Sequence, residues 1–378
     1  MLRKTTFLLL VIALLAAFLL PGCDAVSNLP MPTQLPFNLP GARTPTPAEK
    51  TLLVYTVLSE AQINAYKPIY EQENPGHKLI LERASTWELV RKMIAEKNAP
   101  RADVVWGLAA TAVLRLQAEG ILAPYEPDAE GLRRLGTVNP RMRDRATPPY
   151  WIGHDVFVAA LCVNSAKMDE QGLPYPKSWQ DLIDPVYRNK IVMSNPNISG
   201  TGFMTISAWI QQMGEANAWK YMEALDKNII MYTDSGRKPC TLAADGKAPI
   251  GISFGSAAND ERKRGVAVEA IYPEEGSGWE VETIALIKKD VINPDAVKFV
   301  TWAIGDSAMQ AYAKFYPLTS VKTNITTPPG FTLDPITALI PNRFLWASAN
   351  YDRIVNDWTG RFESKAESSA VDVPEGFR

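Results

Sequence analysis

Short apolar runs alternate with amphipathic segments from Thr51 onwards. Runs rich in β-branched and aromatic residues predict strands at Leu52–Thr56, Lys78–Glu82 and Ala102–Trp106. Apolar residues at helical spacing predict helices at Glu60–Asn74, Thr86–Glu96 and Ala109–Glu119. Strands that alternate with helices of this length predict a parallel sheet in an α/β domain.

The same alternation continues after Pro148-Pro149. The predicted strands are Phe157–Asn164, Lys190–Met193, Ile229–Tyr232, Pro249–Phe254 and Thr283–Ile287. The predicted helices are Gly202–Met213, Ala216–Asp226, Lys238–Asp245, Pro294–Ile304 and an amphipathic segment at Arg343–Trp358, and Ser178 with Asp181 predicts a helix cap. These are too many units for one small sheet, so we predict two α/β lobes. We expect the chain to cross between them near Trp151–Asp155 and Gly276–Thr283, with a ligand cleft between the lobes.

The front of the chain has the order of a secretory signal. Basic Arg3 and Lys4 precede an apolar run from Thr6 to Leu20, and Leu20-Pro21-Gly22-Cys23 follows. This site is similar to the lipobox of bacterial lipoproteins, in which the cysteine receives lipid. We therefore predict a signal peptide over residues 1–22, lipidation of Cys23 and an extracytoplasmic, membrane-anchored protein. An ordinary signal peptide with a chance cysteine and an N-terminal membrane anchor are the alternatives.

The next segment, residues 23–50, contains six prolines and few charges. Proline fixes φ and lacks a donor, so the segment predicts an extended tether between the bilayer and a globular part. We assign residues 51–153 and 280–378 to lobe 1 and residues 154–279 to lobe 2.

Composition narrows the function classes. The hydrophobic content of 46% suffices for a packed core, and a formal net charge of −2 argues against a nucleic-acid partner. With only two histidines, His77 and His154, we predict no metal site based on histidine. Once Cys23 is lipidated, Cys162 and Cys240 remain, either as a disulfide or as two buried thiols.

Four further stretches match a known family. They are Ala102–Ala109, Ser194-Asn195-Pro196 with Ser199–Phe203, Ser235–Cys240, and Ile250–Phe254. Together with the lipobox and tether, they resemble family 1 of the extracellular solute-binding proteins of ABC importers. The resemblance covers roughly Leu52–Tyr316 and is closer to the group for ferric iron, thiamine and phosphonates, most of all to members that bind 2-aminoethylphosphonate. It implies a type II periplasmic-binding-protein fold, a small anionic or zwitterionic solute, a membrane-bound ABC permease as partner, no cofactor, no enzymatic activity and a monomer.

Anion-binding residues are predicted at two helix starts. Ser199, Gly200 and Thr201 open one helix, and free backbone N–H groups there attract anions. In the resembling anion binders this segment contacts phosphate or phosphonate. Ser235 and Gly236 precede a second helix, where we expect Asp234 to point away from an anion or to meet a cation. The alternative at both places is simple helix capping.

The remaining predicted binding residues lie at strand ends and crossings. Thr56, Ser85 and Thr86 supply hydroxyls from lobe 1, with capping as the alternative, and Gly107 allows a close backbone approach. Asp155 is expected to hold an alkylammonium group, unless it is a solvated loop acid. Tyr272 and Trp279 are expected to wall the cleft, unless they pack in the core.

Other solutes and one other class remain open. Ferric iron, phosphate esters and polyamines are the alternative solutes. Ferric binders of the resembling group carry adjacent tyrosines after the strand that here ends in Phe254-Gly255-Ser256, which argues against iron, although Tyr232 or Tyr272 are possible ligands. Gly251-Ile252-Ser253-Phe254-Gly255 matches the nucleophile elbow of serine hydrolases, but both histidines precede Ser253, so the usual order of the triad fails.

Overall fold

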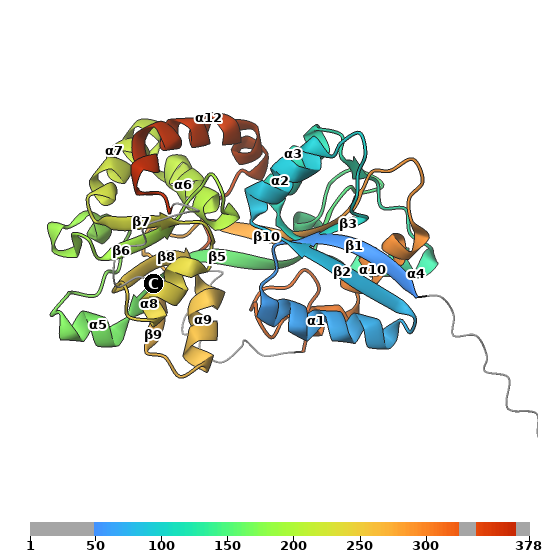
Figure 1. Cartoon of the computed structure of the whole chain (residues 1–378), viewed down its shortest axis with the longest axis horizontal. Coiled ribbons are helices and arrows are strands. Elements are labelled where there is room, and N and C mark those ends of the chain that lie inside the picture. The colour runs from blue at the N-terminus through green and yellow to red at the C-terminus, as the bar shows by residue number, and fades with distance from the viewer. Residues whose placement is uncertain (1–48, 325–337, 368–378) are drawn as a thin grey trace, which may run out of the picture. The chain divides into compact units, whose positions relative to one another are not determined.

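The computed structural model describes residues 49–324 and 338–367, which lie in one compact unit that starts at Ala48 (Figure 1). The predicted signal peptide, Cys23 and nearly all of the predicted tether fall outside these residues. Among the described helices, none combines the length and the apolar character needed to span a bilayer.

A sheet in the order β2-β1-β3-β10-β5-β8-β6-β7 runs through the unit, with β4 beside β10 and β9 beside β5. The strands of its first half are β1 (Lys50–Thr56), β2 (His77–Arg83), β3 (Val104–Ala109) and β4 (Leu122–Ala123). Those of its second half are β6 (Ile191–Ser194), β7 (Ile229–Thr233), β8 (Ile250–Phe254) and β9 (Val268–Ile271). The two halves form the sheets of two lobes, as expected from the sequence.

Helices cover both faces of each half (Figure 1). Lobe 1 carries α1 (Glu60–Glu73), α2 (Thr86–Ala95), α3 (Ala110–Ala118), α4 (Ala129–Thr137), α10 (Pro294–Ala303) and α11 (Asp306–Tyr312). Lobe 2 carries α5 (Ser165–Glu170), α6 (Gly200–Met213), α7 (Glu215–Asp226), α8 (Lys238–Ala244) and α9 (Gly255–Lys263). Most predicted helices are present, because their caps and apolar spacing are local signals. Ser59 and Gln62, for example, form a reciprocal capping box at α1.

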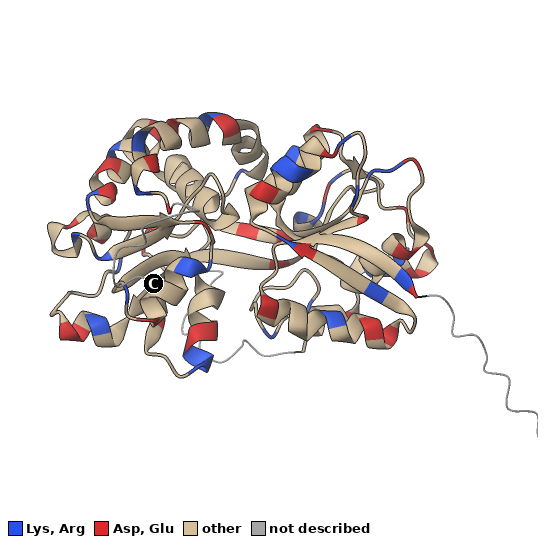
Figure 2. Cartoon of the chain, in the orientation of Figure 1, with Lys and Arg blue, Asp and Glu red and all other residues tan. Residues whose placement is uncertain are grey.

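Two long strands join the lobes. Strand β5 (Ile152–Asn164) pairs first with β10 (Trp279–Ile287) and then with β8, while β10 continues onto β3. Every residue of β5 is buried. The chain therefore crosses at the two places predicted from the sequence. Figure 2 shows acidic residues along these crossing strands.

Two details of the prediction are wrong. The sheet is mixed rather than parallel, because β10 runs antiparallel to both β3 and β5. Ser178 and Asp181 do cap each other, as the hydrogen bond from the Asp181 N–H to the Ser178 hydroxyl (3.0 Å) shows. However, they open only a short 3-10 turn (Gln180–Ile183), since Pro185 follows and cannot continue the pattern.

Helix α12 (Phe344–Phe362) lies across both lobes. Its Tyr351 ring stacks on Trp87 of α2 in lobe 1 (centroids 3.5 Å apart) and meets Phe203 of α6 in lobe 2 edge-on. Further along, Trp358 packs on Tyr232 of β7. The boundaries that we assigned to the lobes remain a prediction, and α12 shows that the end of the chain does not pack on lobe 1 alone.

Candidate functional site

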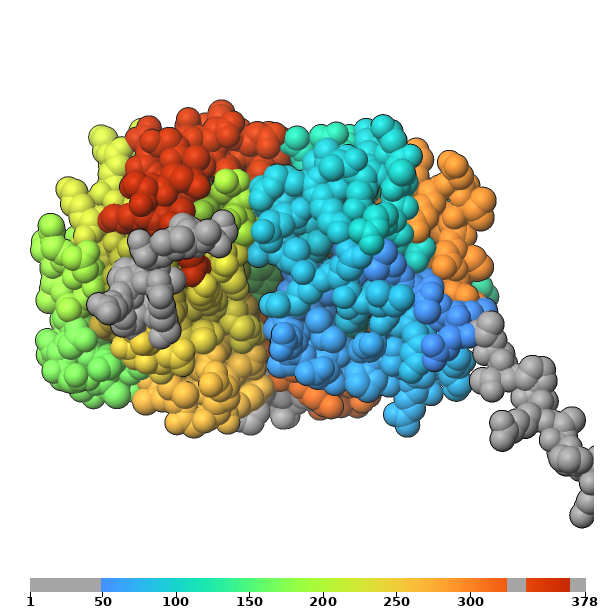
Figure 3. All heavy atoms as spheres, viewed as in Figure 1, coloured from blue at the N-terminus to red at the C-terminus, as the bar shows by residue number. Residues whose placement is uncertain are grey.

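A cavity of about 450 Å³ lies between the lobes, and the surface is hollowed where they meet (Figure 3). Both lobes line it, as a cleft of the predicted kind requires. Eight predicted binding residues are among its walls: Ser85, Thr86, Gly107, Ser199, Gly200, Thr201, Ser235 and Gly236. The volume falls in the range of about 300–1,000 Å³ that is typical of small-molecule sites.

The start of α6 forms one wall. Ser199 caps the helix, and its hydroxyl oxygen accepts from the backbone N–H groups of Thr201 (3.2 Å) and Gly202 (3.4 Å). The cap therefore takes up two of the N–H groups that the sequence left free, but the hydroxyl proton of Ser199 remains able to donate. That hydroxyl proton and the positive end of the helix dipole both favour an anion at this wall.

The loop after β7 packs directly against this helix start. A Cβ atom at Gly236 would overlap the Thr201 hydroxyl and would lie 3.0 Å from that of Ser199. Asp234 is an exposed residue at the edge of the cavity and meets the Lys238 ammonium at 3.6 Å, which is the cationic partner expected for it. Helix α8, which starts at Lys238, has only 7 residues and no side-chain cap. Glycine at position 236 thus brings two hydroxyl-bearing segments to one point of the cavity.

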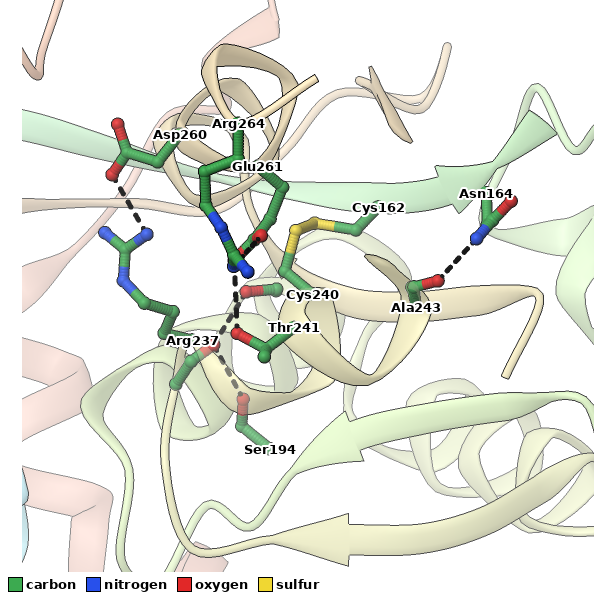
Figure 4. The surroundings of a disulfide bond; sticks show 12 residues. Cys162, Asn164, Ser194, Arg237, Cys240, Thr241, Ala243, Asp260, Glu261 and Arg264 are labelled. Atoms are coloured by element: carbon green, nitrogen blue, oxygen red, sulfur yellow. Dashed lines mark hydrogen bonds and ion pairs between the residues drawn. A yellow bond between two sulfur atoms is a disulfide. The ribbon is translucent and has the colours of Figure 1, made fainter. Parts of the chain in front are cut away.

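Arg237 is one of three cationic residues on the cavity wall, with Arg83 and Lys238, that the sequence analysis did not assign to the site. It pairs with Asp260 of α9 at 3.0 Å (Figure 4). It also lines the cavity and lies over the Phe254 ring. A guanidinium offers more donors than one carboxylate can use, so an oxyanion in the cavity has donors within the same fork. The signal was present in the sequence, since Arg237 directly follows Ser235 and Gly236.

The disulfide Cys162–Cys240 holds this loop in place (Figure 4). It links β5 to the first turn of α8, with the two Cα atoms 5.2 Å apart. Of the two alternatives for these cysteines, the structure therefore has the bonded pair. The bond fixes α8 against a crossing strand and so limits the movement of the loop that carries Arg237.

The lobes touch at the rim of the cavity. The Ser85 hydroxyl donates to the Asp234 carbonyl at 3.0 Å, the Trp87 N–H donates to the Ile198 carbonyl at 3.1 Å, and Arg91 donates to the Asn197 carbonyl at 3.0 Å. A Cβ at Gly200 would lie 2.7 Å from the Thr86 hydroxyl of the opposite lobe. These contacts describe a closed cleft.

Two bulges shape the floor. Gly107 is an extra residue of β3 against β10, and its φ of +86° suits glycine. His154 is likewise an extra residue of β5 opposite Glu282 and Thr283 of β10. A bulge redirects side chains, so the neighbours His154 and Asp155 bond to each other (2.7 Å) instead of pointing to opposite faces.

The groups on this floor are buried and perturbed. Burial lowers the pKa of His154 to about 4, so its ring is neutral at pH 7. Burial raises the pKa of Asp155 and of Glu282 well above the usual range, and the Asp155 charge raises that of Glu282 further. Glu282 lines the cavity, and its carboxylate accepts from the Tyr316 hydroxyl at 3.0 Å.

Three predicted binding residues do not line the cavity. Thr56 is buried and donates to the Trp106 carbonyl at 2.8 Å, so it has the structural role that was the alternative. Asp155 lies behind Glu282 and is fully buried, so it is not a solvated loop acid. Tyr272 packs with its hydroxyl against Gly255.

Other cavity residues were absent from the prediction because isolated hydrophobic or amide side chains carry no signal for a site. Among them are Val57, Gln62, Phe157, Phe254 and Tyr316, together with Arg83 and Glu88, and the cavity is also lined by Ser59, Ala84, Ala109, Lys238 and Thr241.

Ser253 does not have the surroundings of a nucleophile. It is fully buried, and its hydroxyl donates to the Gly236 carbonyl at 2.7 Å. This bond supports the loop after β7. The end of β8, which matches the elbow motif, therefore supports the loop that forms part of the cavity wall.

A family profile described as "Bacterial extracellular solute-binding protein" matches residues 99–340. The chain belongs to this family. The match begins shortly before β3 and ends shortly before α12. It therefore includes both crossing strands and the residues of lobe 2 that line the cavity. Members of this family act outside the cytoplasm, and the chain is a solute-binding protein of the ABC importer type.

Two curated relatives are similar over much of this chain, and the description of one of them agrees with the family. A protein of Haemophilus influenzae without an assigned function is 26% identical over 74% of this chain and 80% of its own length. A probable ABC transporter periplasmic-binding protein, y4fP of Sinorhizobium fredii, is 26% identical over 63% of this chain and 65% of its own.

Solved structures agree with the fold. The periplasmic binding protein AfuA of Actinobacillus pleuropneumoniae, with fructose 6-phosphate bound, superposes with a TM-score of 0.75 at 25% identity, over 84% of this chain and 99% of its own. A periplasmic thiamin binding protein superposes with a TM-score of 0.69 at 19% identity, over 82% of this chain and 96% of its own. The fold is the type II periplasmic-binding-protein fold that the resemblance implied.

Proposed function

We propose that this protein captures a small organophosphorus anion outside the cytoplasm and delivers it to an ABC permease. The observation that carries the proposal is the wall where the capped start of α6 meets the loop after β7 and Arg237. Hydroxyl protons, a helix dipole and a guanidinium converge there, and these groups recognise phosphate and phosphonate oxygens. AfuA, which holds fructose 6-phosphate, supports this class of ligand.

The solute would be released and captured by opening and closing about β5 and β10. Contacts from Ser85 and Trp87 to lobe 2 exist only while the cleft is closed. A solute that touches both lobes favours this state by its differential affinity for it. A micromolar site needs about 8 kcal/mol, which a few charge-assisted hydrogen bonds in a desolvated cleft can supply.

Our first candidate for the solute is 2-aminoethylphosphonate, on the resemblance of the motifs. A sugar phosphate is the second, on the likeness to AfuA. Ferric iron is less well supported, because the two tyrosines considered for it have other surroundings: Tyr232 donates to Asp226 at 2.9 Å, and Tyr272 packs against Gly255. Polyamines fit poorly with the cationic wall around Arg237.

Calorimetric titration of the purified protein tests the proposal. The panel contains 2-aminoethylphosphonate, fructose 6-phosphate, inorganic phosphate, ferric citrate and spermidine, and tryptophan fluorescence follows closure because Trp87 lies buried at the lobe junction. We expect saturable heat from at least one organophosphorus compound. Absence of heat and of a fluorescence change at millimolar concentrations of all of them would refute the proposal.

An esterase assay separates binding from hydrolysis. A binding protein turns over no ester with or without Ser253, whereas a hydrolase loses turnover in the Ser253→Ala variant. Because Ser253 supports the loop at Gly236, loss of solute binding alone in this variant is compatible with the proposed function.

We further propose that a lipid on Cys23 anchors the protein to the membrane. We also propose that the protein is a monomer. Metabolic labelling with a radioactive fatty acid, followed by detergent partition, tests the anchor. We expect label in the wild-type protein and none in the Cys23→Ser variant. Label that persists in the variant would contradict the assignment.

A further inference from the structure

Three ionisable side chains meet behind the floor of the cavity. His154, Asp155 and Glu282 each place a ligand-type atom within 4.8 Å of the others. Asp155 and Glu282 are register partners on β5 and β10, so their side chains lie on one face of the sheet. The bulge at His154 brings the imidazole to the same place, where its ring stacks on Tyr312.

The hydrogen bonds within this group are incomplete. His154 uses Nδ1 for Asp155, and Glu282 uses one oxygen for Tyr316, whose hydroxyl in turn accepts from Gln62. His154 Nε2, Asp155 Oδ1 and Glu282 Oε2 are buried without a partner. Native proteins pair nearly all such atoms, so the two carboxyl groups need either a proton shared between them or a donor from outside.

The charge is also incomplete. Two ionised carboxylates that lie together in a buried place repel each other and lack hydration, so one of them holds a proton unless a cation is present. The charge of Arg237 favours the ionised form of Glu282, but the carboxylate of Asp260 beside it balances that charge. The hydroxyls of Tyr66, Tyr312 and Tyr316 complete the surroundings, and all three are neutral at pH 7 because burial raises their pKa values.

A donor from outside has an access route. Glu282 is 7% exposed and lines the cavity, whereas Asp155 and His154 are fully enclosed. Of these three side chains, only Glu282 can contact a solute in the cavity. Asp155 can affect the solute only through its interaction with Glu282.

We infer that Glu282, backed by Asp155 and His154, is a subsite for the cationic group of a zwitterionic solute, whose ammonium displaces the proton that the two carboxyl groups share. On binding, the ammonium donates one hydrogen bond to the Glu282 carboxylate, and the carboxyl pair releases one proton to solvent. The inference rests on the proposed function and deepens it, because it selects an amino-substituted phosphonate over a sugar phosphate.

Paired ligands test the subsite in the wild-type protein. Ethylphosphonate keeps the two-carbon chain and the phosphonate of 2-aminoethylphosphonate but lacks the amine. Because an ammonium group makes the neighbouring phosphonate more acidic, the ionisation of each free ligand is measured, and affinities are compared for the dianionic forms. One charge-assisted hydrogen bond predicts a preference of about 10- to 100-fold for the amino compound. Calorimetry at pH 7 in two buffers of different ionisation enthalpy, neither a phosphate nor an amine with a free NH₂ group, then counts the protons released. After correction for the ionisation of each free phosphonate, we expect up to one proton released per amino ligand and none for ethylphosphonate.

Two matched variants locate the effect. Glu282→Gln removes the charge and keeps the shape, and we expect it to abolish both the preference and the proton release while ethylphosphonate still binds. Glu280→Gln is the control, since Glu280 is a buried carboxylate of the same strand that bonds to Thr111 and does not line the cavity. Preference and proton release are expected to persist in it.

The outcomes are distinguishable. Equal binding of the two phosphonates, or an unchanged preference in Glu282→Gln, would overturn the subsite and leave the proposed function standing. Tight binding of Mn²⁺ or Zn²⁺ to the solute-free protein, lost in Glu282→Gln, would overturn it in favour of a metal. Binding of no organophosphorus compound would overturn both. If Glu282→Gln does not fold, the paired ligands and the proton count in the wild-type protein still decide.

Discussion

Gly200 offers a direct test of cleft closure. Its Cβ in a Gly200→Ala variant would lie 2.7 Å from the Thr86 hydroxyl and 3.2 Å from Thr86 Cβ and Cγ2, all across the cleft. The nearest of these contacts is far shorter than van der Waals distance, so the lobes must separate by several tenths of an ångström. Within lobe 2 the substitution is mild, because Gly200 is the first residue of α6 and its φ is not positive.

The magnitude follows from this geometry. Overpacking by one methyl group typically costs about 1–3 kcal/mol. Here the penalty applies only to the closed state, so it raises the Kd of the solute by about 5- to 150-fold. Thermal stability without solute should be unchanged or slightly higher, since alanine is a better helix former than glycine.

Titration calorimetry measures the loss of affinity, and thermal unfolding measures stability. A Thr86→Ala background removes the two side-chain atoms beyond Cβ, so the cost of Gly200→Ala should be smaller there than in the wild type. Gly136→Ala in α4, with nothing within 4 Å of its Cβ, is the control. Wild-type affinity in Gly200→Ala, or the same loss in both backgrounds, would refute the closed geometry.

Three further predictions concern the walls and the stability of the fold. Arg237→Ala should weaken binding of an organophosphorus anion by about 10- to 100-fold, the effect of one charge-assisted contact; calorimetry checks this, and an unchanged Kd would contradict the role of Arg237. The Cys162–Cys240 bond closes a loop with a sequence separation of 78, so its reduction should lower the free energy of unfolding by about 4 kcal/mol; urea unfolding with and without reductant measures it, and equal midpoints would count against the bond. Burial raises the pKa of Glu280 to about 7. Between pH 4.5, the ordinary pKa of a glutamate, and pH 7, the Glu280 carboxyl group is protonated in the folded protein and ionised in the unfolded chain. The free energy of unfolding should therefore fall by about 3 kcal/mol as the pH rises from 4 to 7. Urea unfolding from pH 4 to 8 should show this slope in the wild type and a smaller one in Glu280→Gln; parallel profiles would show that Glu280 is not its source.

Much of the site was predictable from local sequence. Ser199-Gly200-Thr201 and Ser235-Gly236 signal a helix start and a tight loop through their own backbone preferences, and the structure places both on the cavity wall. The carboxylate was harder to assign. Asp155 lies at a predicted crossing and looked suited to hold a cation. Glu282 directly precedes the predicted strand Thr283–Ile287 and carried no signal of its own.

The pairing of β5 with β10 explains this difference. Strict alternation along a strand would send His154 and Asp155 to opposite faces. The extra residue at position 154 exists only relative to β10, so no pattern within either strand predicts it. The antiparallel direction of β10 escaped prediction for the same reason, since the partner of a strand lies far away in sequence.

The sequence by itself therefore determined the elements, the crossings and the turns at Ser199–Thr201 and Ser235-Gly236 that line the cavity, because periodicity, capping and glycine preferences act over a few residues. Only the tertiary structure decided which acid opens on the cavity, that Arg237 reaches it and that α12 spans both lobes. These features depend on contacts between segments more than 100 residues apart, such as Asp155 with Glu282 and Trp87 with Tyr351, whose register and packing are fixed only when the lobes assemble.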